Sequence, residues 1–135
     1  MFKKILIANR GEIAVRIIRA CKELGVQSVA IHSDVDTDAM HVKLADESVC
    51  VGGALPNLSY LNIPNIMSAI NITGADAVHP GYGFLSENDK FAKILHKHEV
   101  KFIGPSSKSI LALGNKSNAL KIAYENNLPI LGNKD

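Results

Sequence analysis

The sequence predicts an open, mostly parallel α/β sheet with helices on both faces. Short apolar runs in the chain are typical of strands buried on both faces of a parallel sheet. Longer stretches carry apolar residues every three or four positions, which is the period of an amphipathic helix. The two patterns alternate about five times, and such alternation requires right-handed crossovers between parallel strands.

The first strand and helix show how each element is identified. Lys4-Ile-Leu-Ile-Ala-Asn9 is a short apolar run that predicts a strand, and Arg10-Gly11 turns the chain. From Glu12 apolar residues recur at helical steps, so a helix is expected up to Gly25, a natural helix stop. The same patterns predict further strands at 26–32, 48–51, 75–79, 101–104 and 128–131, and helices at 38–45, 63–73, 89–98, from 105 to about 114, and from 115 or 117 to about 126.

Composition and charge exclude several classes of function. Of all residues 47% are hydrophobic and 21% are charged, which is typical of a globular domain with a real core. The net charge is +2 and the basic residues are scattered, with Lys3-Lys4 as the single adjacent pair of Lys or Arg, so nucleic acid is not an expected partner. No stretch approaches the roughly 18 apolar residues of a membrane span, and the first apolar run ends at Asn9, too early for a secretory signal.

Cys21 and Cys50 are the only cysteines in the sequence. Both lie in apolar patterns, so we expect two buried, reduced thiols rather than a disulfide or a metal-binding pair. Reduced thiols indicate a cytoplasmic protein.

Residues 79–88, His-Pro-Gly-Tyr-Gly-Phe-Leu-Ser-Glu-Asn, form the segment where a site is expected. Its proline and two glycines force turns that leave backbone N–H groups unpaired and free for a ligand. Tyr82 and Phe84 alternate with the glycines and offer flat apolar surfaces beside bare backbone. The alternative is a long surface connection whose aromatic side chains only pack it down.

A parallel sheet also predicts what faces this loop. Ligands of open α/β sheets bind beyond the carboxyl ends of the strands, where the strand order reverses. If strand 4–9 is central and pairs with strand 75–79, the Arg10-Gly11 turn faces loop 79–88. A fixed cation and a helix N-terminus would then lie opposite a glycine-rich loop, which suits an anion or a polar headgroup. The alternative for Arg10 is a solvated charge or half of a domain-interface ion pair.

A dinucleotide site is the rival interpretation of the first strand, turn and helix. Gly11 stands alone, because Asn9 occupies the first glycine position of the G-x-G-x-x-G fingerprint. Without that fingerprint the pyrophosphate could not approach the backbone closely. Asp34 and Asp36, after the second strand, are then interpreted as turn and N-cap residues.

Four further side chains are candidates for chemistry: Lys116, His79, Ser86 and Glu87. Lys116, in the P-loop-like tail Gly114-Asn-Lys-Ser117, lies at the start of an expected helix, where an ammonium can reach a phosphate; the alternative is a surface charge. None of the five histidines shows metal-ligand spacing, and His79 is expected to hydrogen-bond the loop backbone. Ser86 and Glu87 form no recognisable triad, so Glu87 is expected to cap the next helix.

Several of these motifs occur together and in a fixed order. They are Ile7-Ala-Asn-Arg-Gly-Glu-Ile-Ala14, Ile63-Pro64 with Thr73-Gly74, His79 to Asn88, Phe102-Ile-Gly-Pro105 and Gly114-Asn-Lys-Ser117. As a set they closely resemble the N-terminal domain of biotin carboxylase, along the whole chain. The spacing and the start at Met1 look most like the separate biotin carboxylase subunit of bacterial or plastid acetyl-CoA carboxylase. The resemblance implies a Rossmann-like domain of the type that precedes an ATP-grasp domain.

The resemblance implies an ATP-dependent ligase. Such an enzyme uses Mg-ATP and bicarbonate to form carboxyphosphate, then transfers the carboxyl group to biotin on a carrier protein, which needs electrostatic clamps and an enclosed, dry site. The Mg²⁺ ligands and the catalytic residues are expected in the ATP-grasp domain, beyond Asp135. Pyruvate and propionyl-CoA carboxylases share the motifs within larger chains. A non-catalytic binding or assembly module, with association through the first helix, is the competing class.

The resemblance also implies roles for particular residues. Lys116 matches an ATP contact, although Asn115 replaces the family's usual Asp before it. Tyr82 and Gly83 match the loop that faces the biotin pocket. Three charged residues of the first helix match the family's dimer surface: Arg16, Arg19 and Glu23.

We therefore expect residues 1–114 to form the Rossmann-like domain and residues 115–135 to begin the connection into an ATP-grasp domain. The 135 residues alone are expected to lack catalysis. The complete enzyme is expected to act with a biotin carboxyl carrier protein and a carboxyltransferase, and to form a homodimer. Its expected location is the cytoplasm or the plastid stroma.

Overall fold

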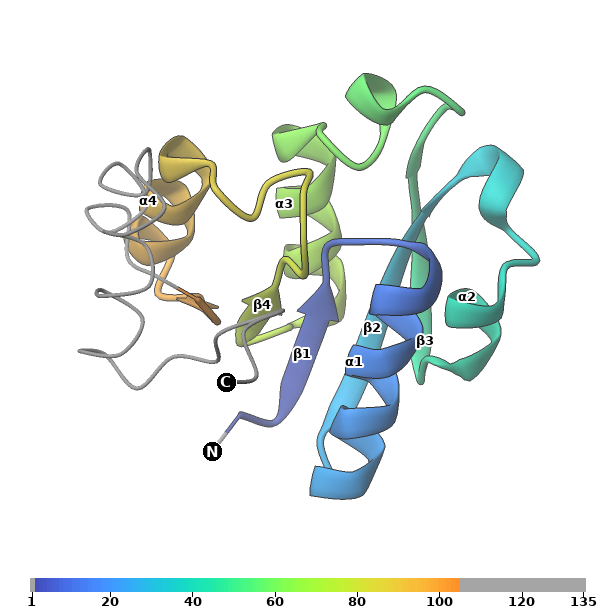
Figure 1. Ribbon diagram of the computed structural model, residues 1–135. Helices are drawn as coiled ribbons and strands as arrows, with labels where there is room; N and C mark the ends of the chain where they lie inside the picture. The colour runs from blue at the N-terminus through green and yellow to red at the C-terminus, as the bar shows by residue number, and fades with distance from the viewer. Residues whose placement is uncertain (1, 105–135) are drawn as a thin grey trace, which may run out of the picture.

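The computed structural model describes residues 2–104 and shows a five-stranded parallel sheet flanked by helices (Figure 1). The strands lie in the order β3-β2-β1-β4-β5. Their bounds are β1 Lys4–Ile7, β2 Gln27–Ser33, β3 Glu47–Gly52, β4 Ala77–His79 and β5 Lys101–Phe102. Both the predicted fold class and the predicted pairing of the first strand with the fourth are confirmed.

The helices begin and end close to the positions that the sequence predicts. They are α1 Gly11–Leu24, α2 Met40–Leu44, α3 Ile63–Thr73 and α4 Asp89–Lys97, with short 3-10 turns η1 Asp34–Asp36 and η2 Pro56–Leu58. The bounds of α3 agree with the prediction because local signals fix both of its ends. Asn62 caps the first turn by accepting a hydrogen bond from the backbone N–H of Asn65, and Gly74 closes the last turn.

The helices cover the two faces of the sheet, and each face has its own apolar core. Ile5 and Ile7 of β1 pack with buried residues of α1, including Ile18, on one face. Leu6 points to the other face, where it belongs to the core formed with α3 and α4. Because successive side chains of a strand alternate between faces, this short central strand contributes to both cores.

The two cysteines differ in burial, and the prediction for one of them is wrong. Both are free thiols; Cys21, on the inner face of α1, is buried, but Cys50 is exposed. Cys50 lies on β3, an edge strand of the sheet, where alternate residues face outward. An apolar pattern therefore did not ensure burial at the edge.

Several predictions concern residues that the structure does not describe. This applies to the elements expected after residue 104, to Lys116 and to the boundary between residues 114 and 115. Among the described residues, no helix has the length and apolar character needed to cross a bilayer.

Candidate functional site

The strand order reverses at β1. From β1 the sheet extends through β2 to β3 on one side, and through β4 to β5 on the other. The segments that follow β1 and β4 are the Arg10-Gly11 turn and loop 80–88, and both lie at the carboxyl edge of the sheet (Figure 1). This is the place where open α/β sheets bind ligands.

Asn9 joins these two segments. Its side chain is buried, and its Nδ2 donates to the carbonyl oxygens of Pro80, at 2.8 Å, and Tyr82, at 2.5 Å. Its Oδ1 accepts a hydrogen bond from the backbone N–H of Arg10 at 2.8 Å, so the amide group faces the loop with its donors. The sequence analysis noted Asn9 only because it occupies a glycine position of the dinucleotide fingerprint. No neighbouring residue indicates that its hydrogen-bond partners lie more than 70 residues away.

Gly81 and His79 set the start of the loop. Gly81 has a left-handed φ of +64°, and a Cβ at this position would lie 2.8 Å from the Nδ2 of Asn9. Its N–H donates to the Nδ1 of His79 at 3.1 Å, which confirms the predicted bond between His79 and the loop backbone. Burial lowers the pKa of His79, so the imidazole is neutral and Nδ1 is available as an acceptor.

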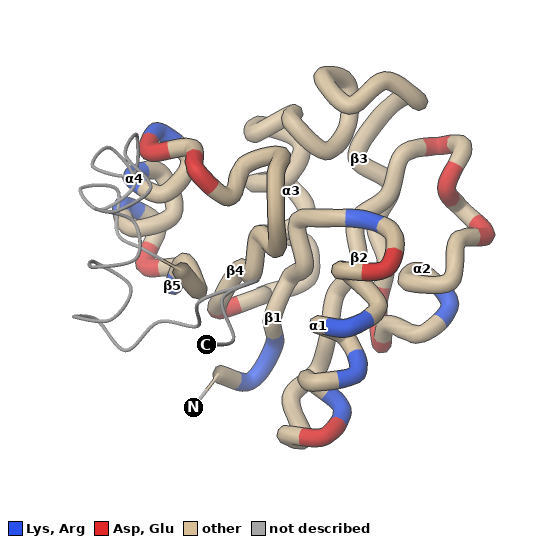
Figure 2. Tube along the Cα trace, viewed as in Figure 1, with Lys and Arg blue, Asp and Glu red and all other residues tan. Residues whose placement is uncertain are grey.

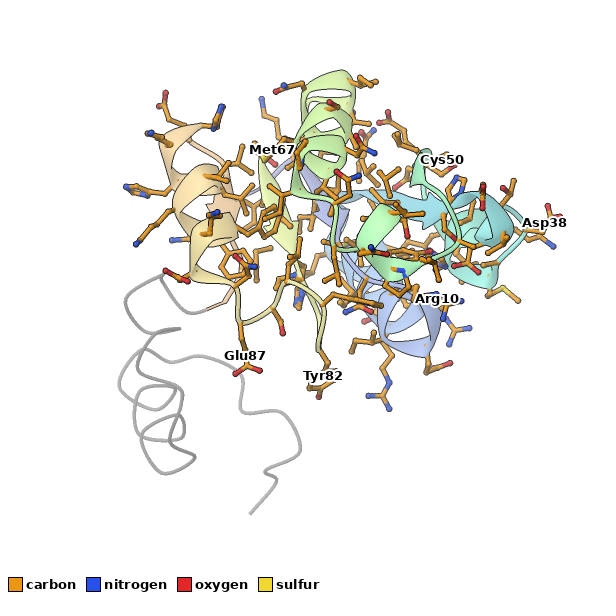
Figure 3. All side chains as sticks on the ribbon, turned by 90° about the horizontal axis from the view of Figure 1, so that it is seen from above. Arg10, Asp38, Cys50, Met67, Tyr82 and Glu87 are labelled. Carbon is orange, nitrogen blue, oxygen red and sulfur yellow. The ribbon has the colours of Figure 1, made fainter. Side chains whose placement is uncertain are left out.

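The loop uses carbonyl groups in hydrogen bonds and leaves several N–H groups without a partner among the described residues. The carbonyl of Tyr82 accepts from Asn9, and that of Gly83 accepts from the N–H of Ser86 at 2.8 Å. Within residues 2–104, the N–H groups of Tyr82, Gly83 and Phe84 have no hydrogen-bond partner. The side chain of Tyr82 is exposed and, with Glu87, projects away from the sheet (Figure 3). The outer side of the loop thus suits a ligand that presents a carbonyl or an anionic oxygen.

Arg10 does not face this loop as an uncommitted cation. Its Nε and Nη2 each donate to the carboxylate of Asp36 at 3.0 Å, and its guanidinium lies 5.8 Å from the ring centre of Tyr60. Arg10 is therefore fixed, but Asp36 balances its charge, and a role for Arg10 in binding an anion at the loop stays a prediction. The alternative of an ion pair is correct in kind, but the partner, Asp36, lies in this same domain and not across a domain interface.

Asp36 and Tyr60 complete a polar network with Arg10. The hydroxyl of Tyr60 donates to Asp36 Oδ2 at 2.7 Å and accepts from the buried N–H of Ser33 at 3.1 Å. The Arg10 guanidinium, which outweighs burial, and the Tyr60 hydroxyl together lower the pKa of Asp36 to about 2. The proposed N-cap role of Asp36 is wrong, because Ala39 precedes α2 and the Asp36 carboxylate is occupied by Arg10 and Tyr60.

Tyr60 also holds the far end of the loop. It is 1% exposed, and its ring stacks on the ring of Phe84 with centroids 5.3 Å apart. Phe84 has a left-handed φ of +44°, which is uncommon for a residue with a Cβ. No sequence pattern pointed to Tyr60, since its partners lie in three other segments of the chain.

The N-cap of α4 is Asn88, one residue after the predicted Glu87. Asn88, not Glu87, accepts the hydrogen bond from the N–H of Phe91, at 2.8 Å. The prediction for Glu87 is wrong because its side chain is exposed, whereas Asn88 has the short amide that suits an N-cap. In residues 2–104 no three His, Cys, Asp or Glu side chains are grouped so that they could hold a metal ion.

The outer face of α1 carries the charged residues that the resemblance connects with dimers. Several basic residues lie along this helix (Figure 2). The three residues that the resemblance connects with the dimer surface are all exposed: Arg16, Arg19 and Glu23. They lie on α1, away from loop 80–88 in sequence and on the opposite side of the helix from its buried stripe. No hydrogen bond or ion pair joins them to another part of residues 2–104.

Together these features define a class of protein. A parallel sheet with a glycine-rich loop held against the first βα turn, at the point of strand reversal, has the architecture in which open α/β domains bind ligands. Residues 1–110 match the family model of the biotin carboxylase N-terminal domain. The chain belongs to this family, as the sequence motifs predict.

Relatives occur in carboxylases with different substrates. The chain is 55% identical over 128 residues to a biotin carboxylase of Nostoc sp., covering 95% of this chain and 29% of that protein. It is 59% identical over 122 residues to the mitochondrial propionyl-CoA carboxylase alpha chain of Caenorhabditis briggsae, covering 90% of this chain and 16% of that protein. The chain thus spans less than a third of these relatives.

A solved structure of the same family has the same fold. It is the biotin carboxylase domain dimer of the Hydrogenobacter thermophilus 2-oxoglutarate carboxylase, in complex with MgADP, ADP and bicarbonate. The TM-score is 0.80 with 47% sequence identity, and the match covers 96% of this chain and 28% of that one. The biotin carboxylase N-terminal domain is therefore common to carboxylases of several substrates.

Proposed function

We propose that this chain is the N-terminal part of a biotin carboxylase, an ATP-dependent ligase that carboxylates carrier-bound biotin with bicarbonate. The observation that carries the proposal is membership of the family over residues 1–110. The complex of a relative with MgADP and bicarbonate supports the same substrates here. Because the chain spans less than a third of its relatives, catalysis is proposed for the complete protein only.

The loop after β4 is proposed to form the biotin side of the site, through Tyr82 and Gly83. The ureido group of biotin offers a carbonyl oxygen, and the N–H groups of Tyr82, Gly83 and Phe84 are donors without partners in residues 2–104. The exposed Tyr82 ring supplies a flat apolar surface for the fused rings of biotin. The described part of the domain thereby binds and orients the acceptor rather than catalysing the transfer.

Lys116 is proposed to contact ATP, since a lysine beside a glycine at a helix start can reach a phosphate. Mg²⁺ would neutralise phosphate charge in the complete enzyme. The described residues do not fit that ion, because they hold no group of three suitable ligands. We assign no step to the metal on these residues and propose that its ligands lie beyond Asp135.

The proposed partners are a biotin carboxyl carrier protein and a carboxyltransferase, in an acetyl-CoA carboxylase of the cytoplasm or plastid stroma. A homodimer through Arg16, Arg19 and Glu23 is supported by the dimer of the 2-oxoglutarate carboxylase domain. Propionyl-CoA carboxylase is a second candidate, because the alpha chain of C. briggsae is 59% identical to this chain over 122 residues. The residues that select the acyl-CoA belong to the carboxyltransferase in either case.

The test is biotin-dependent ATP hydrolysis by the complete protein encoded by the gene. We expect activity that requires bicarbonate, Mg²⁺ and a biotinylated carrier, and none above background from the 135-residue chain. Lys116→Ala in the complete protein should raise the KM for ATP several-fold, which corresponds to a loss of about 1 kcal/mol or more of binding free energy.

Three results would contradict parts of this proposal. Turnover by the pure 135-residue chain would show that catalysis does not need later residues, and unchanged ATP kinetics would remove Lys116 from the site. In a reconstituted system with carrier and carboxyltransferase, a preference for propionyl-CoA over acetyl-CoA would favour the second candidate.

A further inference from the structure

Both polar atoms of the Asn9 side-chain amide form hydrogen bonds, and together these bonds join the turn after β1 to the loop after β4. One end donates to the carbonyls of Pro80 and Tyr82, and the other accepts from the N–H of Arg10. The side chain is 3% exposed, so these bonds are shielded from water. A group with this pattern fixes the loop relative to the central strand, and no other residue type of this size has two donors and an acceptor in these places.

The loop needs such a restraint. Gly81, Gly83 and Phe84 all have left-handed φ values, of +64°, +64° and +44°. For Phe84, which has a Cβ, this conformation costs roughly 1–2 kcal/mol. Gly81 and Gly83 carry no such cost, but each can adopt many other backbone conformations, so an unrestrained segment would not keep this one. The contacts that hold it lie at its two ends: Asn9 at Pro80 and Tyr82, and the ring of Tyr60 at Phe84.

Gly83 lies between these two contacts. Its N–H has no partner among the described residues, whereas its carbonyl is occupied by Ser86. The direction of that N–H is thus set by how Tyr82 and Phe84 are held on either side. If Tyr82 were released from Asn9, both the unpaired N–H groups and the Tyr82 ring would be free to change direction.

We propose that Asn9 is a positioning residue, which holds loop 80–84 in its ligand-binding conformation before the ligand arrives. The inference rests on the proposed function, in which that ligand is carrier-bound biotin. Holding the loop in advance removes the entropy cost of ordering it at binding. Loss of the Asn9 donors should therefore weaken binding of biotin and leave binding of ATP largely unchanged.

The sharpest variant is Asn9→Asp in the complete protein. It keeps the size of the side chain and the acceptor for Arg10, but places a carboxylate oxygen against the carbonyls of Pro80 and Tyr82. With a biotinylated carrier as substrate, we expect the KM for carrier to rise about five-fold or more and the KM for ATP to change less than about two-fold. Hydrogen exchange should become faster at the N–H groups of Gly81 and Ser86, which the native loop protects.

Asn65→Asp is the matched control. Its Nδ2 donates to the carbonyl of Val51 at 2.8 Å, so the substitution also places a carboxylate oxygen against a carbonyl, at an exposed position away from the loop. A general loss of stability would lower the amount of active protein in both variants. Only Asn9→Asp should change the KM for carrier and the exchange of the loop.

Each outcome supports or overturns the inference. A folded Asn9→Asp protein with native loop exchange and a native KM for carrier overturns it. Faster loop exchange in a protein whose wild type has no biotin-dependent turnover supports the positioning role and rejects the proposed function. If Asn9→Asp does not fold, Asn9→Ala is measured in the same way, and failure of both to fold overturns positioning in favour of a structural role.

Discussion

Asp36 is a single residue whose acidity is set by its neighbours. The Arg10 guanidinium and the Tyr60 hydroxyl stabilise its ionised form, and the pKa is about 2. The carboxylate is 14% exposed and Arg10 is half-exposed, so water screens the pair only in part. The network joins the turn after β1 to η1 and to the segment before α3, three parts of the carboxyl edge.

Asp36→Asn should lower the free energy of unfolding at neutral pH by about 1–2 kcal/mol. The pKa of Asp36 in the folded protein lies below the roughly 3.9 of an unfolded chain, so the stabilisation is present above about pH 4 and is lost as the pH falls toward 2. Urea unfolding of both proteins at a series of pH values measures this. The difference between them should shrink below about pH 4, and a difference that stays constant down to about pH 2.5 would contradict the ion pair.

At the scale of an element, α4 begins where the candidate loop ends. Its first turn depends on Asn88, whose side chain accepts from the N–H of Phe91, while Phe91 itself is buried in the core shared with α3. The cap therefore fixes where the loop stops and the helix starts. Asn88 and Glu87 are neighbours, but only Asn88 caps α4, whereas Glu87 is exposed and makes no such bond. Comparing variants at the two positions therefore tests the role of the cap.

Asn88→Ala should cost about 1 kcal/mol of stability, the usual effect of removing an N-cap. Glu87→Ala should change it by less than about 0.5 kcal/mol, as for a surface side chain. Thermal or urea unfolding of the two single variants gives the comparison. Equal losses in both would mean that Glu87 contributes to the cap after all.

At the scale of the whole molecule, the charged outer face of α1 is distinct from the carboxyl edge of the sheet, where the candidate site lies. α1 packs its apolar stripe on β1 and β2 and leaves Arg16, Arg19 and Glu23 exposed. A domain arranged in this way can associate through one surface and bind substrate at another. This separation makes self-association testable without a direct change to the site.

Arg19→Glu in the complete protein should raise the dissociation constant of the proposed homodimer about ten-fold or more, because a charge of the wrong sign then enters the interface. Lys90→Glu, at an exposed position of α4, is the control and should leave association unchanged. Sedimentation velocity over a range of concentrations measures both. Dimers of native strength in Arg19→Glu would remove this surface from the interface.

Much of the architecture could be predicted because its causes are local or repetitive. The period of apolar residues predicted the strands and helices, including a helix at 63–73, whose two ends are fixed locally by Asn62 and Gly74. Alternation of strands and helices, with the rule of right-handed crossovers, then indicated which loops meet at the carboxyl edge. The edge position of β3 was not predictable in this way, so Cys50 was placed wrongly.

The sequence by itself determined the fold class, the family and the loop that carries the candidate site, since backbone preferences and motif order are properties of neighbouring residues. Only the tertiary structure decided the partners of Asn9, Arg10 and Tyr60, which come from segments 24 to 73 residues apart. Hydrogen bonds and ion pairs depend on distances of about 3 Å in space, and folding sets those distances between residues that no local pattern relates.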